Sequence, residues 1–342
     1  MGKHRITIVV GLIISVALLW WALRDVSISE LLVQVGNANF LLLGASVAVA
    51  TGTFALRALR WRVLLLPVLE HSAFHSRFSA TCIGFAANNL LPARLGEFAR
   101  VVSLTRLEPI GIGAAFASLV IERLFDAIVL IVFLFPAFYL PGLAGEVPDL
   151  VRQAFVVGLV AVGIGLITLG LVVRFPDRFL SVAERWMHRL LPDRFADRIG
   201  GLLSSIIKGL GALRHAHVFL QAIAWSVVVW LWNAASFWLG FLAFDIETPG
   251  FAGAVLLQSI IGMAVAIPSS PGFFGPFEAA SRVALSLYGV DPTRIISFAA
   301  GYHIFSMIPI TVIGLYFANQ LGLTWSEVER SEEVVESAEE RE

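Results

Sequence analysis

The chain has 342 residues, of which 58% are hydrophobic and 14% are charged, and its net charge at pH 7 is −1. Soluble proteins are about half apolar and about a quarter charged, so this composition excludes a pair of ordinary soluble domains. The apolar residues lie in long blocks with few charges, which predicts an all-α polytopic membrane protein.

Six apolar runs are long enough to cross a hydrocarbon core about 30 Å thick, which takes roughly 20 residues. The first run ends at Leu23-Arg24-Asp25 without a small-residue cleavage site, so we interpret it as a retained span and not as a signal peptide. The six predicted transmembrane helices are Ile6–Leu23, Phe40–Leu56, Ile112–Phe135, Ala154–Val173, Val218–Phe244 and Ile295–Ala318.

Two further apolar segments contain turn residues. Phe78–Leu91 includes Asn88-Asn89 and is followed by Pro92, and Phe251–Ile267 runs into a stretch rich in proline and glycine. Backbone that leaves a helix at membrane depth is tolerated only where protein buries it or water fills a cavity. We therefore expect the turns in these two segments to be buried by protein or to line a water-filled cavity.

The placement of lysine and arginine predicts the direction of the spans, because basic residues concentrate in cytoplasmic loops. The amino terminus and residues 57–77 and 174–217 are rich in them, whereas 24–39, 139–153 and 245–250 hold only two in total. This distribution predicts a cytoplasmic amino terminus, and we place the carboxyl terminus in the cytoplasm as well, in a multi-pass protein of the plasma (inner) membrane.

The same distribution limits the number of crossings. Because 57–77 is predicted inside and 139–153 outside, the segment Phe78–Leu91 must enter and leave on the cytoplasmic side. The same argument applies between 245–250, which is predicted outside, and the carboxyl terminus, which is placed in the cytoplasm. It makes Phe251–Gly289 a hairpin that enters from the outside. Two opposed re-entrant hairpins are therefore predicted, with eight spans as the alternative if both hairpins cross.

The two halves of the predicted order are alike, each being span, span, hairpin, span. A single transmembrane domain, residues 1–325, would consist of inverted repeats of about 1–138 and 150–320, a plan that many transporters share, with their sites at broken helices. Residues 326–342 hold eight glutamates and two arginines, which predicts a disordered acidic tail.

Four motifs lie in the predicted loop 57–77, at the predicted hairpin tips and in the third predicted span: Arg57-Ala-Leu-Arg60-Trp61, Asn88-Asn89-Leu-Leu-Pro92-Ala-Arg94-Leu-Gly96-Glu97-x2-Arg100, Glu122-Arg123-x2-Asp126 and Pro271-Gly272-x2-Gly275-x2-Glu278. Over roughly residues 5–320 the chain thereby resembles the flippase-like membrane domain of lysylphosphatidylglycerol synthases. Full-length synthases add a soluble transferase domain, whereas this sequence ends in the acidic tail. The resemblance therefore implies lipid translocation or a related lipid-handling role and not aminoacyl transfer, with aminoacyl-phosphatidylglycerol or a polyprenyl-phosphate carrier as candidate lipids.

Several polar residues at the first tip are candidates for substrate binding. The guanidinium of Arg94 could hold a phosphodiester through two parallel hydrogen bonds, or could extend to the interface as a cytoplasmic charge. Glu97 could pair with Arg94 or Arg100, accept from a substrate amine, or cap the following helix. Asn88 and Asn89 could donate to phosphate or satisfy backbone that the break exposes.

Glu122 and Asp126 lie four residues apart and share a helix face, so a common partner is expected, such as an arginine of the first hairpin. Arg123 points elsewhere and could pair with Glu97 or bind phosphate. These contacts could be structural ion pairs or part of a substrate or proton path.

Glu278 could cap the second return helix or be the outer counterpart of Glu97, and His303 could relay protons or bond to a backbone carbonyl. The complete set of predicted substrate-binding residues is Arg94, Glu97, Arg100, Asn88, Asn89, Arg123, Glu122, Asp126, Glu278, Gly96 and Gly275.

No catalytic residues, metal site or cofactor are predicted, because no nucleophile accompanies the carboxylates and the histidines do not cluster. Basic residues flank the spans and form no single patch, which excludes nucleic acid as a partner. The leading hypothesis is a translocator of a phospholipid or polyprenyl-phosphate lipid. The alternatives are an integral-membrane transferase and a non-catalytic partner of a cell-envelope enzyme, and a homo-oligomer is a further expectation.

Overall fold

The computed structural model describes residues 2–92, 94–137, 149–190, 200–201, 203–204, 207, 216–265, 269–323 and 327. Within these ranges every regular element is a helix. Parts of the predicted outer loop 139–153, of the basic connection 174–217 and almost all of the acidic tail lie outside the described residues. Of the tail, Glu327 is described, and its carboxylate accepts a hydrogen bond from Arg106 at 2.9 Å.

Three of the described helices are long and apolar enough to cross a membrane: α3 (Phe40–Leu65), α10 (Ala216–Ala243) and α13 (Pro292–Gln320). Helices α1 (Gly2–Leu23) and α2 (Ile28–Gly36) would make a fourth span if counted together, although the pair bends by 83°. The chain is therefore a membrane protein. Helices α6 (Ile112–Ala137) and α7 (Asp149–Arg174) also have 26 residues each, but the middle of α6 carries three charged side chains.

The sequence-based end of the second span was wrong. Helix α3 continues to Leu65, so Arg57 and Arg60 are buried helical residues and not part of a cytoplasmic loop. Arg77 is buried as well, in the next helix, where its Nε donates to the carbonyl of Ala58 at 2.9 Å. A charged residue interrupts the apolar run in the sequence. It does not end the helix when its charge is paired with other side chains inside the bundle.

Both predicted hairpins are helix–break–helix units. The first consists of α4 (Phe74–Leu90) and α5 (Gly96–Leu107). The second consists of α11 (Gly250–Ala264) and α12 (Pro276–Ser286), with a short 3-10 turn, η2 (Pro271–Phe273), in the break.

Glycines allow the first hairpin to close. A Cβ on Gly96 would lie 1.9 Å from the carbonyl oxygen of Gly84, and one on Gly84 would lie 2.8 Å from the Cβ of Arg100. Helices α4 and α5 therefore approach each other so closely that a side chain at either glycine would separate them.

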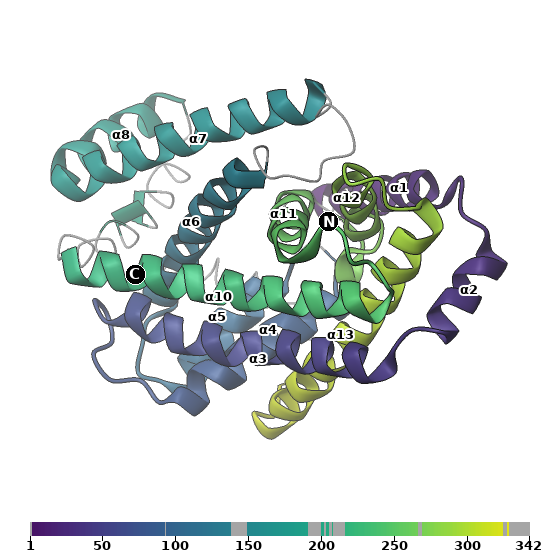
Figure 1. The fold of residues 1–342 in the computed structure, drawn as a ribbon. Coiled ribbons are helices and arrows are strands. Elements are labelled where there is room, and N and C mark those ends of the chain that lie inside the picture. The colour runs from purple at the N-terminus through teal and green to yellow at the C-terminus, as the bar shows by residue number, and fades with distance from the viewer. Residues whose placement is uncertain are drawn as a thin grey trace.

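The eight helices α3–α6 and α10–α13 pack in a pattern that repeats between the halves. Helices α3 and α10 lie side by side at the base of Figure 1, α6 packs on α11 of the other hairpin, and α13 packs on α4. The remaining extensive contacts among these eight helices also occur in matching pairs, such as α3 with α6 and α10 with α13. Each hairpin is thus held between the long helices of both halves.

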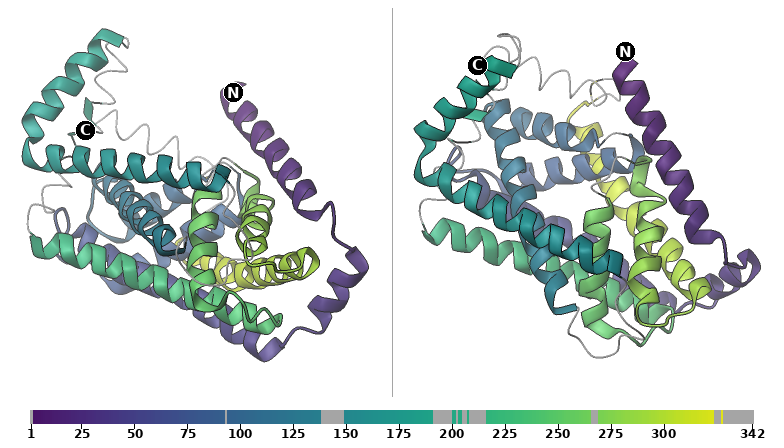
Figure 2. Two further views of the ribbon diagram at one scale, coloured as in Figure 1. Left: turned by 45° about the horizontal axis from the view of Figure 1, so that its top comes forward. Right: turned by 90° about the horizontal axis from the view of Figure 1, so that it is seen from above.

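Helices α7 and α8 (Pro176–Leu190) extend along one side of this bundle (Figure 2). Helix α8 is amphipathic, with Trp186 and Val182 exposed and Phe179 packed against the core beside α6. This arrangement suits a helix at the membrane surface.

Candidate functional site

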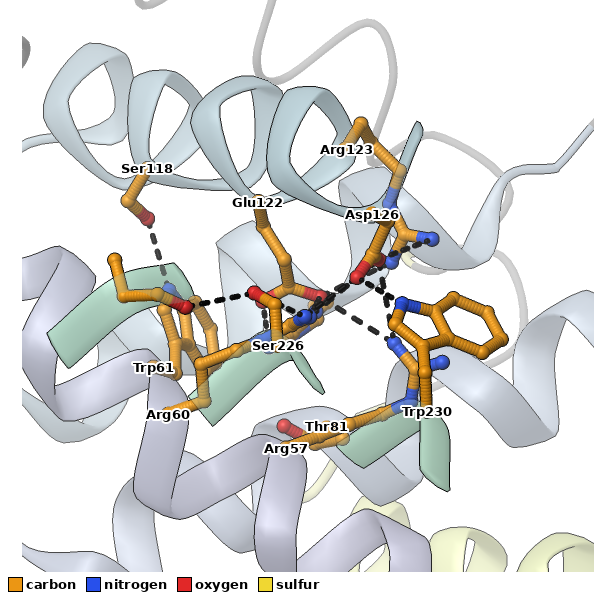
Figure 3. Close-up of polar contacts among 12 residues, drawn as sticks. Arg57, Arg60, Trp61, Thr81, Ser118, Glu122, Arg123, Asp126, Ser226 and Trp230 are labelled. Carbon is orange, nitrogen blue, oxygen red and sulfur yellow. Dashed lines mark hydrogen bonds and ion pairs between the residues drawn. The ribbon is translucent and has the colours of Figure 1, made fainter. Parts of the chain in front are cut away.

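Two helices that are distant in the sequence bring the centre of the site together. Arg57 and Arg60 lie one turn apart on α3, and Glu122 and Asp126 lie one turn apart on α6 (Figure 3). Arg60 is the partner common to both carboxylates: its Nη2 lies 3.0 Å from Glu122 Oε1, and its Nη1 lies 2.5 Å from Asp126 Oδ1. The two carboxylates thus share an arginine of α3.

The first hairpin adds a third arginine. Arg100 on α5 binds Glu122 with both arms of its guanidinium, at 2.9 Å and 3.0 Å. Its guanidinium carbon lies 3.9 Å from the centre of the Trp61 ring. A two-armed pair of this kind fixes the orientation of both side chains.

Neutral donors and acceptors hold the cluster in place. Trp230 of α10 donates its Nε1 hydrogen to Asp126 at 2.8 Å, and Ser226 accepts from Arg60 at 3.2 Å. Trp61 donates to Ser118 at 2.9 Å. Three helices and one hairpin arm are therefore locked to one another around a buried polar centre (Figure 3).

Arg57 differs from the other arginines of this cluster because its ion pairs are long. Its Nη1 lies 3.8 Å from Glu122 and 3.6 Å from Asp126. That nitrogen is buried and has no hydrogen-bond partner, while the guanidinium lies over the rings of Phe85 and Trp230. The Nε atoms of Arg60, Arg100 and Arg123 are also buried without a hydrogen-bond partner, so the long ion pairs are what set Arg57 apart. A buried donor without an acceptor is costly.

The cluster reaches the surface at Arg123. Its Nη2 lies 3.1 Å from Glu122 and 3.6 Å from Glu97 of α5, and these side chains are 40% exposed for Arg123 and 25% exposed for Glu97. Four arginines therefore face two buried carboxylates, Glu122 and Asp126, with Glu97 as a third carboxylate at the open edge. We name this group the arginine cluster; it consists of Arg57, Arg60, Arg100, Arg123, Glu122 and Asp126. The arginine cluster carries excess positive charge.

The tips of the two hairpins meet beside this open edge. Arg94 adopts a positive φ of 57° and donates to the carbonyl of Val265, just after α11, and its guanidinium lies 5.7 Å from the ring of Phe273. Arg94 thus contacts the second hairpin and not the arginine cluster.

The asparagines at the first tip are occupied within the protein. Asn88 accepts a hydrogen bond from the backbone of Gly96 at 2.9 Å, and Asn89 donates to Thr311 of α13 at 2.9 Å. Of the alternatives for Asn88, the structure shows the one in which it satisfies backbone that the break exposes.

The second hairpin has a different chemistry. Glu278 accepts from the backbone of Gly275 at 2.6 Å, which is a capping contact, and its other oxygen lies 2.8 Å from Nδ1 of His303. Gly275 has a φ of 95°, and a Cβ there would lie 2.3 Å from the backbone oxygen of Ser15 in α1. The predicted residues therefore fall into separate groups, because Glu278 and Gly275 do not reach the arginine cluster.

The other charged residue of α12 holds the end of α1. Arg282 donates to the carbonyls of Trp21 and Ala22 at 3.0 Å and 2.6 Å and pairs with Asp25 at 2.7 Å. The hydrogen bond from Arg282 lowers the pKa of Asp25 below its ordinary value of 3.8. The contact gives Arg282 a structural role near the surface.

Sequence reasoning omitted Arg57 and Arg60 from the predicted site. The sequence shows their spacing of three residues and the adjacent Trp61, but the charges there predict a loop. A helix continued by one more turn would have placed both arginines on one face and identified them as candidates. Among the described residues, no group of three or more His, Cys, Asp or Glu side chains is placed to hold a metal.

Comparisons with known proteins bear on this geometry. The family model described as the lysylphosphatidylglycerol synthase TM region matches residues 8–314. The glycosyltransferase AglD of Haloferax volcanii is 27% identical, over 91% of this chain and 54% of that protein, so the chain spans about half the length of this relative. A UPF0104 membrane protein of Methanothermobacter thermautotrophicus is 22% identical, over 85% of this chain and 86% of that protein. No solved structure matches the chain.

Proposed function

The chain belongs to the family of the lysylphosphatidylglycerol synthase transmembrane region, and from that premise we propose that it binds the phosphate of an anionic lipid and moves the lipid between leaflets. The observation that carries the proposal is the buried Nη1 of Arg57, which has no hydrogen-bond partner inside a cluster with excess positive charge.

A phosphate suits this position for reasons of charge and geometry. Charges inside a membrane protein are expensive unless they are paired, and four guanidiniums exceed three carboxylates when Glu97 is included. A guanidinium presents planar, paired donors that match phosphate oxygens, which an ammonium does not. A lipid phosphate at Arg57 would supply the missing acceptor and offset the excess charge.

The open edge gives the headgroup a route. Arg123 and Glu97 are partly exposed, and Arg94 stands next to them where the hairpin tips meet. A headgroup entering there would contact Arg94 and Arg123 before it reaches Arg57, while its acyl chains remain in the bilayer. Arg94, Glu97, Arg100 and Arg123 therefore stay in the proposed path, with Arg57 added to it.

We further propose that both hairpins are re-entrant and that the halves are inverted repeats. At about 1.5 Å per residue, the 12 residues of α5 and the 11 of α12 extend for less than 20 Å, which is short of a hydrocarbon core about 30 Å thick. The matching contacts of α3–α6 and α10–α13 support a repeat. Hairpins that meet from opposite sides would expose their shared site to each leaflet in turn.

The test is a leaflet-exposure assay in proteoliposomes that contain labelled phosphatidylglycerol or a labelled polyprenyl phosphate. We expect Arg57→Gln to slow translocation at least tenfold. The matched control is Arg106→Gln, which removes an arginine whose partner, Glu327, lies at the surface, and which should leave the rate unchanged. Equal rates for wild-type protein and Arg57→Gln would remove the arginine cluster from the mechanism.

A second candidate function follows from the similarity to a glycosyltransferase over 91% of the chain. In this alternative the protein would present or modify a lipid-linked substrate for glycosyl transfer, instead of moving the lipid. Formation of a glycosylated lipid by the purified protein with a sugar donor, in the absence of leaflet exchange, would favour this alternative over translocation.

A further inference from the structure

The pair formed by Glu278 and His303 is the second buried ionisable centre of the described residues and is separate from the arginine cluster. Both side chains are buried, with Glu278 Oε1 2.8 Å from His303 Nδ1. The imidazole is stacked on Phe277 at 4.1 Å and lies 4.7 Å from the ring of Phe274. The partner of His303 is thus a carboxylate and not a backbone carbonyl.

The charge of this pair depends on one proton. If the neutral imidazole donates its Nδ1 hydrogen to the carboxylate, the pair carries one negative charge; the position of that hydrogen is assigned from the contact. Protonation of the other ring nitrogen gives a carboxylate–imidazolium pair with no net charge. An uncompensated charge at membrane depth is expensive. The protonated pair, which has no net charge, is therefore favoured when the protein closes it off from water. The deprotonated pair, which has one negative charge, is favoured when water reaches it.

Three other ionisable groups, on α12, on α13 and at the tip of the first hairpin, have partners of their own. Arg282 of α12 points to α1 and Asp25, and Tyr302 of α13 shares a hydrogen bond with Ser236 at 2.7 Å. Arg94 of the first hairpin bonds to Val265. Helix α11, which packs on α12, contains no charged residue.

The helices α2, α3 and α4, which pack on α13, hold the titratable groups discussed next away from the pair. From α4, His75 contacts Phe317, which is about four turns along α13 from His303, and Arg77 donates to Ala58. Glu30 of α2 is exposed, and the arginines of α3 at positions 57 and 60 belong to the arginine cluster. None of these groups is therefore a partner of Glu278 or His303.

The pair is linked to an apolar groove through Phe274. The ring of Phe274 lies against His303 and also lines a groove of about 330 Å³ along α13. The other lining residues are Ile304, Met307, Ile308, Thr311 and Val312. Thr311 is the residue bonded to Asn89 of the first hairpin. A change at Glu278, which also holds Gly275 by its backbone, thus acts on the tip and on the groove wall together.

We propose that the Glu278–His303 pair binds one proton that is transported together with the lipid. This proposal rests on the proposed lipid translocation. The proton enters the pair from one aqueous side and leaves to the other, and no bond in the lipid is made or broken. Carrying one proton with a phosphodiester that has one negative charge makes the transported species electrically neutral.

The experiment uses proteoliposomes with labelled phosphatidylglycerol and an imposed difference of one pH unit across the membrane. For one proton per lipid, a tenfold proton ratio supports up to about a tenfold ratio of labelled lipid between the leaflets at steady state. We expect this ratio in wild-type protein and its loss in Glu278→Gln and in His303→Gln. The control Asp25→Asn, which removes the carboxylate that pairs with Arg282, should retain it.

The outcomes separate this proposal from the proposed function. If wild-type protein moves lipid but ignores the pH difference, or if both variants still respond to it, proton coupling is wrong and translocation stands. If wild-type protein moves no lipid, the proposed function itself fails. Should neither variant fold, proton uptake measured alongside lipid movement in wild-type protein decides, and its absence overturns the proposal.

Discussion

The two hairpins have the same architecture but hold their ionisable groups differently. In the first half, α5 joins α6 through arginines and carboxylates that no single proton can neutralise. In the second half, α12 joins α13 through one glutamate and one histidine, whose combined charge changes with one proton. One structural plan can therefore hold a cluster of fixed positive charge in one half and a glutamate–histidine pair in the other, and our proposals assign the lipid phosphate to the first and the proton to the second.

The largest expected effect comes from removing the central carboxylate of the first half. Glu122→Gln leaves Arg60 and Arg100 without their shared partner, and breaking a buried pair of this kind costs about 3–5 kcal/mol. Unfolding in mixed detergent micelles measures this loss. Glu278→Gln is the matched change in the second half, and it should cost about 1 kcal/mol because glutamine still accepts from Gly275 and histidine can be neutral. If Glu122→Gln and Glu278→Gln lowered the free energy of unfolding by similar amounts, the proposed difference between the two halves would be wrong.

The close approach of α4 and α5 gives a second, smaller effect. Gly96→Ala forces a Cβ against the backbone of Gly84, so we expect a loss of about 1–3 kcal/mol and a displaced Arg100. Gly163→Ala in α7 is the control, since nothing lies within 4 Å of its Cβ position, and alanine there should be neutral or slightly stabilising. The measurement is the same unfolding assay, and an unchanged Gly96→Ala protein would show that the hairpin is looser than described.

The smallest effect concerns Asp25 and Arg282. Because the folded pKa of Asp25 is lowered, the pair contributes stability above the unfolded pKa, near 3.8, and loses it as the pH falls through the folded value. Asp25→Asn should therefore differ slightly from wild type in thermal stability at pH 7, and the difference should vanish in strong acid. If the stability difference between Asp25→Asn and wild-type protein increased as the pH falls, the stabilising role of the Asp25–Arg282 pair would be contradicted.

The sequence was sufficient for most of the long helices and insufficient for α2, which lies in the predicted loop 24–39, and for the ends and partners of the helices. Long apolar runs predicted α3, α10 and α13, and prolines with glycines predicted both breaks. The spacing of Glu122 and Asp126 indicated that they would share a partner, but the partner, Arg60, lies more than sixty residues earlier and was assigned to a loop. Contacts of this range depend on how helices pack, which periodicity along one helix does not reveal.

The separation of Glu278 from Glu97 was also beyond the sequence. Their motifs are similar in spacing, which suggested equivalent roles, yet Glu97 faces an arginine and Glu278 faces a histidine. The difference arises from one residue on each following helix, Arg123 on α6 and His303 on α13. The angular position of that residue around its helix determines which side chain each glutamate contacts.

The claim that a lipid phosphate occupies the place beside Arg57 is tested most directly by native mass spectrometry of the purified protein. Wild-type protein and Arg106→Gln should retain phosphate-bearing lipids through detergent exchange, whereas Arg57→Gln should lose about nine-tenths of them, which corresponds to about 1.4 kcal/mol of binding free energy. Equal retention of these lipids by Arg57→Gln and wild-type protein would contradict the claim.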